Sequence, residues 1–168
     1  MKKYTSFSIL VITLFTITSC KYYSFTGGNT GDAKTLQVDF FPNRAPLVEP
    51  SLSQAFTLEL QDLFLRQTNL TLTKNNGDLY FSGEITGYRI TPMTATSDQT
   101  AAQNRLTITI EVRFENKLVE EDNFEKSFSF YYDYGASQQL SGSVLDSAFE
   151  EILERITQDI FNASVAKW

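Results

Sequence analysis

The chain has no histidine and a single cysteine, Cys20, among its 168 residues. Without them it cannot use a histidine base or a second thiol, and it lacks the ligands of most zinc sites. No glycine-rich phosphate loop or calcium-binding acidic run occurs. Carboxylate pairs and Ser–Lys dyads are possible by composition, but no segment has their spacing. We therefore expect a protein that is not an enzyme and that uses no cofactor or metal.

The first twenty residues have the pattern of an export signal. Met1-Lys2-Lys3 is basic, Phe7 to Ile17 is mostly apolar, and small residues precede Cys20. A membrane-spanning helix needs about 20 apolar residues, which this run does not reach. A cysteine in this position resembles the lipobox of bacterial lipoproteins. We therefore predict a signal peptide at residues 1–19 and a lipidated Cys20; the alternative is an ordinary cleavage site of a soluble secreted protein.

Lys21, which follows the cysteine, predicts the destination. An aspartate there is the usual inner-membrane retention signal, and an acidic cluster directs some lipoproteins to the cell surface. The chain has neither, which favours the periplasmic face of the outer membrane. Several acyl chains on one cysteine anchor a protein durably, because each buried methylene contributes about 0.8 kcal/mol.

Cleavage would leave an acidic chain long enough for one domain. Residues 1–19 hold two of the 14 basic residues and none of the 20 acidic ones. This balance disfavours nucleic acid, whose phosphates bind basic proteins, and charge-driven binding to anionic lipid. We expect a flexible, glycine-containing tether at residues 20–34 and a single domain at residues 35–168.

Hydrophobic periodicity predicts an α/β (α+β) two-layer sandwich, with two helices on one face of a mostly antiparallel or mixed sheet. The order is strand, helix, strands, helix. In the first strand, Leu36, Val38 and Phe40 are expected on the buried face. The expected strands span residues 36–40, 70–73, 79–90, 106–114 and 124–132, and the expected helices span residues 51–66 and 143–160.

A sheet covered on one side leaves its other face free. Alternation assigns to this free face Tyr80, Ser82, Glu84, Thr86, Tyr88, Thr107, Thr109, Glu111, Arg113, Ser127, Ser129 and Tyr131. One interpretation is an ordinary solvated face. The other is a wet binding surface, since tyrosines among serines and threonines offer apolar area and hydrogen bonds together.

Three short segments carry signals of their own. Pro42-Asn43-Arg44-Ala45-Pro46 should be stiff and non-helical, because two prolines restrict it. Thr91 to Gln103 is expected to be an exposed loop. Asp146-Ser147-Ala148 resembles an O-glycosylation sequon of some bacteria, which makes Ser147 a modification candidate; the simpler interpretation is an acid favoured in a first helical turn.

Five short stretches, spread along almost all of the chain after Cys20, carry a family resemblance. They are Tyr23–Gly28, Phe40–Val48, Gly83–Tyr88, Asn104–Thr109 and Asp159–Trp168. These stretches resemble LptE, the outer-membrane lipopolysaccharide-assembly lipoprotein, in a divergent form carried by one bacterial phylum. The Pro-Asn-Arg-Ala-Pro loop is the most specific of them.

The resemblance implies the same sandwich and a non-enzymatic role. LptE-like proteins plug the large β-barrel LptD, help it assemble and assist delivery of lipopolysaccharide to the outer leaflet. The expected partners are an LptD-like barrel, lipopolysaccharide, and the outer membrane through the lipid anchor. A polar free face suits a polar lumen. The alternative is a stand-alone periplasmic lipoprotein that binds a small ligand or envelope polymer, which would need a concave apolar pocket.

Two sets of contact candidates follow. The candidates for barrel contact are Asn43, Arg44, Tyr80, Tyr88, Thr107, Thr109 and Tyr131. Some family members are proposed to bind lipopolysaccharide through basic residues, so Arg89, Arg105 and Arg113 are the candidates for that contact. We expect these three to cluster near one edge, where guanidinium groups match phosphate. The alternative is that each is a solvated strand-end charge or an ion-pair partner.

Overall fold

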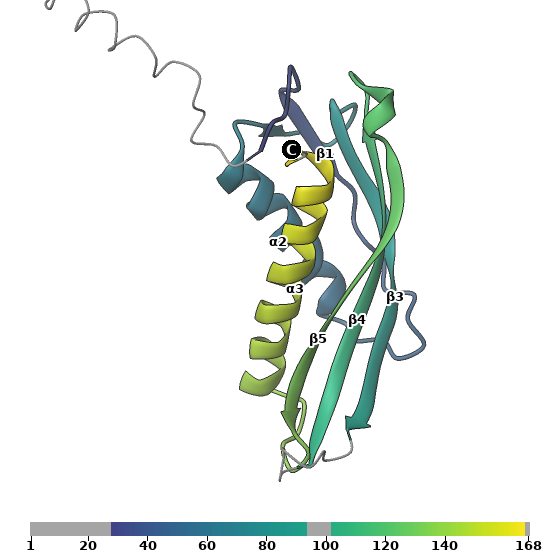
Figure 1. Ribbon diagram of the computed structural model, residues 1–168, viewed down its shortest axis with the longest axis vertical. Coiled ribbons are helices and arrows are strands. Elements are labelled where there is room, and N and C mark those ends of the chain that lie inside the picture. Colours follow the sequence, from purple (N-terminus) through teal and green to yellow (C-terminus); the bar gives the residue numbers. More distant parts are fainter. Residues whose placement is uncertain (1–27, 94–101, 167–168) are drawn as a thin grey trace, which may run out of the picture.

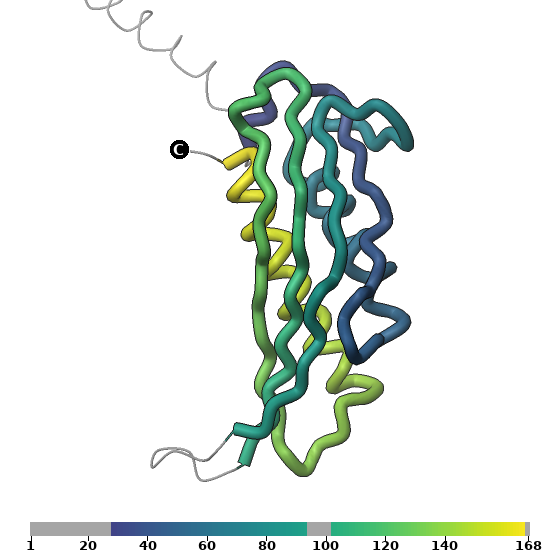
Figure 2. The backbone as a smooth tube through the Cα atoms, turned by 90° about the vertical axis from the view of Figure 1, so that its right-hand side faces the viewer, coloured from purple at the N-terminus to yellow at the C-terminus, as the bar shows by residue number. Residues whose placement is uncertain are grey.

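The chain folds into one sheet with two helices packed against the same face of it (Figure 1). The computed structural model describes residues 28–93 and 102–166. In a view turned by 90°, the strands lie in front of the helices, so the free face has no described helix over it (Figure 2). This architecture confirms the predicted two-layer sandwich.

The elements follow the predicted order of strand, helix, strands and helix. They are β1 (Thr35–Val38), α2 (Leu52–Gln67), β2 (Thr71–Leu72), β3 (Leu79–Met93), β4 (Gln103–Asn116), the 3-10 turn η2 (Glu120–Asp122), β5 (Phe124–Gly135) and α3 (Ser143–Ser164). The sheet order is β2-β1-β3-β4-β5, with β1 parallel to both of its neighbours and the remaining pairs antiparallel. The sheet is therefore mixed.

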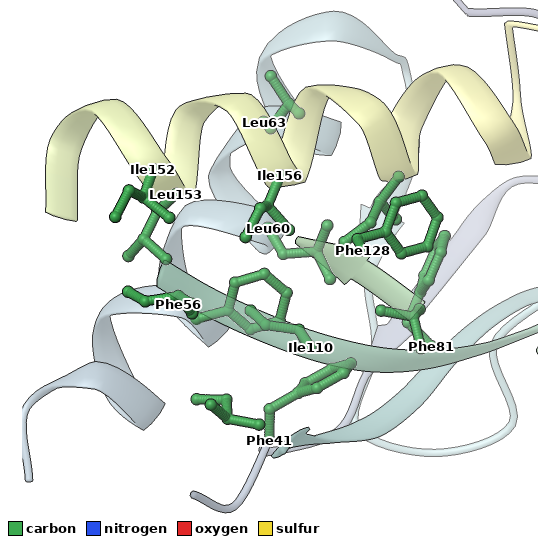
Figure 3. Close-up of a cluster of buried hydrophobic side chains, with 14 of the residues drawn as sticks. Phe41, Phe56, Leu60, Leu63, Phe81, Ile110, Phe128, Ile152, Leu153 and Ile156 are labelled. Carbon is green, nitrogen blue, oxygen red and sulfur yellow. The ribbon is translucent and has the colours of Figure 1, made fainter. Parts of the chain in front are cut away.

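The core between the sheet and the helices is rich in phenylalanine (Figure 3). The Phe64 ring of α2 lies 5.0 Å, centroid to centroid, from Phe81 of β3 and also from Phe161 of α3. One side chain thereby joins the sheet to both helices. Burying a phenylalanine contributes about 1.5–3 kcal/mol, and favourable ring geometry adds to it.

The first described residues are packed on the domain. The Asn29 amide donates to the Val165 carbonyl (2.7 Å), and a Cβ on Gly28 would meet the Phe161 ring. The amides of Lys34 and Thr35 both donate to the Asp78 carboxylate, which lowers its pKa. Residues 28–34 therefore belong to the domain, and the predicted tether extends too far.

The remaining tether residues, the predicted signal peptide and Cys20 lie outside the described residues. None of the helices formed by residues 28–93 and 102–166 has the length and hydropathy to cross a membrane. The predicted loop at Thr91 to Gln103 is shorter than expected. Thr91 to Met93 pair with β4 as part of β3, because alternating backbone hydrogen bonds continue there. Residues 94–101 are also outside the described part.

Phe41 interrupts the pairing of the first segment with β3. The Asp39 amide donates to the Phe81 carbonyl (2.9 Å), and the next such contacts are at Ile85, whose amide donates to the Pro42 carbonyl (2.9 Å) and whose carbonyl accepts from the Arg44 amide (2.8 Å). Between them Phe41 turns into the core and packs against Phe56, with centroids 4.9 Å apart. Phe40 is consequently turned outward and 62% exposed, so the prediction that it is buried is wrong.

A β-bulge in β3 corrects a second prediction. Beyond the register shift between Ile85 and Gly87, Gly87 pairs with Thr109 and Tyr88 with Ile108. Tyr88 therefore lies on the core face, and burial, helped by the nearby Glu49 charge, raises its pKa to about 12. The prediction of Tyr88 on the free face is wrong, because one extra residue reverses every later side chain.

Gly83 should be essential to the packing of Phe41 against β3. Its φ is +155°, and a Cβ there would collide with the Glu111 carbonyl oxygen and lie 2.7 Å from the Phe41 ring. We expect Gly83→Ala to lower the free energy of unfolding by about 3 kcal/mol or more. Gly31→Ala, at φ +55° in open space, should lower it by only about 1–2 kcal/mol. Urea unfolding followed by circular dichroism measures both; equal losses would contradict the role of Gly83.

Candidate functional site

The free face of the sheet is a set of cross-strand polar pairs, formed because alternate residues of β4 and β5 point away from the helices. From β3 it receives Tyr80, Ser82, Glu84, Gly87 and Arg89. The β4–β5 rows are Arg105 with Asp133, Thr107 with Tyr131, Thr109 with Ser129, Glu111 with Ser127, and Arg113 with Glu125. Every one of these rows can form hydrogen bonds.

Arg105 forms a shorter ion pair than Arg113 does on this face. Its Nε and Nη2 donate to the two carboxylate oxygens of Asp133 at 2.7 and 2.8 Å, and its guanidinium lies 3.6 Å from the Tyr131 ring centroid. The bidentate hydrogen bonds raise the pKa of Arg105 and lower that of Asp133. This pair holds Tyr131 in place while leaving it 43% exposed.

The other free-face pairs are more open. Arg113 donates from Nη2 to Glu125 at 3.0 Å, with both side chains more than half exposed. The Thr109 and Ser129 hydroxyls lie 3.0 Å apart, and Ser129 donates to the Ile108 carbonyl. Hydroxyl groups therefore lie between the two ion pairs, together with the carboxylate of Glu111.

The three arginines do not form one cluster. Arg105 and Arg113 are eight residues apart on β4, roughly 27 Å along the strand. Each forms an ion pair, as the alternative interpretation predicts. Arg89 pairs with Thr107 one row from Arg105, is exposed, and has no ion pair to any described residue. The prediction of a common cluster is wrong because β4 spans the length of the sheet.

The barrel-contact candidates fall in different surroundings. Thr107, Thr109 and Tyr131 lie together in the middle of the free face. Tyr80 is half-buried and donates to Asp39 (2.6 Å), a bond that raises the pKa of Tyr80. These contacts position the side chains; their role in binding stays a prediction.

Asn43 and Arg44 lie in the loop between β1 and α2. The Asn43 side chain accepts from the Ala45 amide and donates to the Glu49 carbonyl, so it shapes the loop from within. Arg44 is exposed and makes no ion pair within the described part of the chain. Ser147 is exposed in the N-terminal part of α3, and its modification also stays a prediction.

One arrangement on the free face could not be found by alternation alone. Glu84 and Glu111 lie directly opposite each other, beside a shallow hollow of about 290 Å³ that is floored by Gly83. Like charges in this geometry are unfavourable, and neither carboxylate has an ion pair among the residues described. The pairing becomes visible only with the register of β3 against β4.

Comparison with known proteins shows the family. The family model described as LptE, lipopolysaccharide-assembly, matches residues 33–164. The chain belongs to the LptE family. Residues 33 and 164 nearly coincide with the packed domain, which begins with the segment fixed by Asp78 and ends with α3. No curated protein sequence matches the chain.

Solved structures share this fold at low identity. A hypothetical protein from Chlamydia trachomatis is 10% identical, with a TM-score of 0.52, over 80% of this chain and 99% of that one. A minor lipoprotein from Acinetobacter baumannii is 11% identical, with a TM-score of 0.48, over 79% of this chain and 96% of that one. At 10% identity, the likeness to the Chlamydia protein supports the fold of this LptE-family chain and nothing about its function.

The Arg105–Asp133 pair should make stability depend on pH. The pKa of Asp133 is lower in the folded protein than its ordinary 3.8. The carboxylate therefore stabilises the fold above that value, and the contribution is lost as the pH falls through the folded pKa. Asp133→Asn should lower the melting temperature at pH 6, and its deficit relative to wild type should shrink below about pH 4. A deficit that is the same at every pH would contradict this assignment.

Proposed function

We propose that the protein is a non-enzymatic outer-membrane lipoprotein that plugs an LptD-type β-barrel, assists its assembly and helps deliver lipopolysaccharide to the outer leaflet. Membership of the LptE family supports a lipoprotein of the lipopolysaccharide-assembly type in the cell envelope. The finer role rests on the free face. A domain that works inside a wet lumen must present a large, rigid and polar surface.

The dimensions and the order of the free face support this role. The 15 residues of β3 and the 14 of β4 extend roughly 45 Å. A barrel's lipid-facing band is about 25 Å tall, so these strands are long enough to line the lumen across it. Side chains already held by Asp133 and Glu125 lose little further freedom on binding, which favours affinity.

A small-ligand binding module is less well supported. A groove of about 610 Å³ runs between α2 and α3. Its lining combines Ala55, Leu63, Phe149 and Leu153 with Glu59, Arg66, Gln67, Glu150, Glu154 and Gln158. Small-molecule sites are predominantly apolar with a few polar groups. This groove instead has more polar than apolar residues in its wall.

A photo-crosslinking amino acid tests which face meets the barrel. Placed at Thr109, in the middle of the free face, it should capture a barrel protein in native outer membranes. The matched control is the same amino acid at Asp62, which is exposed on α2 in the helical layer. We expect Thr109 to give the stronger adduct, detected by mass shift. A folded protein that forms no adduct from Thr109 would refute the plug.

The lipid anchor is tested separately. Cys20→Ser should abolish palmitate labelling, because no other thiol exists to be acylated, and should reduce the share of the protein in the outer-membrane fraction to what the barrel retains. Fractionation with immunoblotting measures the second effect. A Cys20→Ser protein that still carries label would contradict lipidation at this residue.

A further inference from the structure

Three large apolar side chains are exposed in the segment that joins β1 to α2. Phe40, Leu47 and Val48 are 62%, 52% and 58% exposed. We call the segment 40–48 the apolar loop. Single exposed apolar residues are ordinary on protein surfaces. Three within nine residues, beside a cation at Arg44, place apolar area next to a phenylalanine and an arginine, two residue types enriched at interfaces.

The apolar loop is held rigidly. The Ile85 amide donates to the Pro42 carbonyl (2.9 Å), and the Arg44 amide donates back to the Ile85 carbonyl (2.8 Å). Beneath the loop, Phe41 and Ala45 are fully or almost fully buried. Two prolines and these contacts fix the backbone, so the exposed side chains are presented in one arrangement. Binding through them therefore requires little additional ordering.

The position of the loop favours a protein partner over the lipid surface. In both views the loop stands at the β1–β3 side of the sheet, whereas the described chain begins on the opposite side, beside the C-terminal end of α3 (Figures 1 and 2). Gly28 is eight residues after Cys20, at most about 29 Å of extended chain. The proposed anchor therefore joins the domain on the side away from the loop.

The apolar loop itself does not suit addition of a partner strand. It carries Pro42 and Pro46, and proline cannot donate a ladder hydrogen bond. On the β5 edge, Lys126 pairs with Val112 and so sits on the core face, an inward charge of the kind that blocks edge pairing. The apolar loop therefore binds a partner through its side chains and not by adding a strand to the sheet.

We propose that the apolar loop anchors the protein to its β-barrel partner. Phe40, Leu47 and Val48 enter an apolar recess of the barrel protein, and Arg44 meets a carboxylate beside that recess. This inference rests on the proposed function and specifies the surface that supplies most of its affinity. Asn43 contributes by shaping the loop through its bonds to Ala45 and Glu49.

The test is co-purification from native outer membranes, with the lipid anchor intact. The variant is Phe40→Ser/Leu47→Ser/Val48→Ser. Its matched control is Leu58→Ser/Leu65→Ser, which removes two leucines that are 48% and 41% exposed on α2. We expect the loop variant to recover about thirtyfold less barrel, and the α2 variant to recover as much as wild type. Both should melt within a few degrees of wild type, since the substituted side chains are exposed.

Arg44→Glu is the second variant, and it does not touch the apolar packing. It should reduce barrel recovery several-fold with an unchanged melting temperature. If the triple variant melts at a lower temperature than wild type, the recovery measured with Arg44→Glu tests the inference in its place. Wild-type recovery by both loop variants overturns the inference and leaves the plug intact. A wild-type protein that recovers no barrel overturns the proposed function, and the inference with it. A loop variant that keeps the barrel but loses binding to phosphatidylethanolamine–phosphatidylglycerol vesicles assigns the loop to lipid and also overturns the inference.

Discussion

The packing of Phe41 over Gly83 is the contact on which the rest of the molecule depends. Phe41 leaves the edge of the sheet, meets Phe56 of α2 and donates its amide to the Thr57 hydroxyl (3.2 Å). It can do so only because Gly83 has no side chain. One residue thereby fixes the first segment to the sheet and to a helix. The same turn exposes Phe40 and sets the course of the loop that follows.

On the free face of the sheet, ion pairs hold side chains in fixed positions and leave the surface accessible. Arg105–Asp133 and Arg113–Glu125 lie near the two ends of the β4–β5 pair, with hydroxyl groups between them. The exposed Arg113–Glu125 pair contributes little to stability. The main effect of the two pairs is to hold long side chains in defined positions, which leaves Tyr131 and Thr109 presented on a stable surface.

Much of the fold follows from periodicity, and the departures have local physical causes. The alternation in β4 and the three- and four-residue spacing in α3 are strong because one face of each element is buried. The bulge after Ile85 has no such signal, so Tyr88 was assigned to the wrong face. The ion pairs of the arginines depend on the register between strands, and the packing of Gly28 depends on a contact with Phe161, far away in sequence. Candidate positions such as Thr107 and Thr109 were placed correctly, because alternation alone decides their face.

The aromatic rings at the edge of β5 affect how two copies of the chain can meet. Arg105 covers Tyr131, Tyr131 stacks on Phe130 with centroids 5.5 Å apart, and Arg155 of α3 lies over Phe130. Since neighbouring strand residues point to opposite faces, this stack runs around the outer edge of β5. Charged side chains on an outer strand oppose edge-to-edge pairing with another sheet. The β5 edge is therefore poorly suited to joining a second copy of the chain.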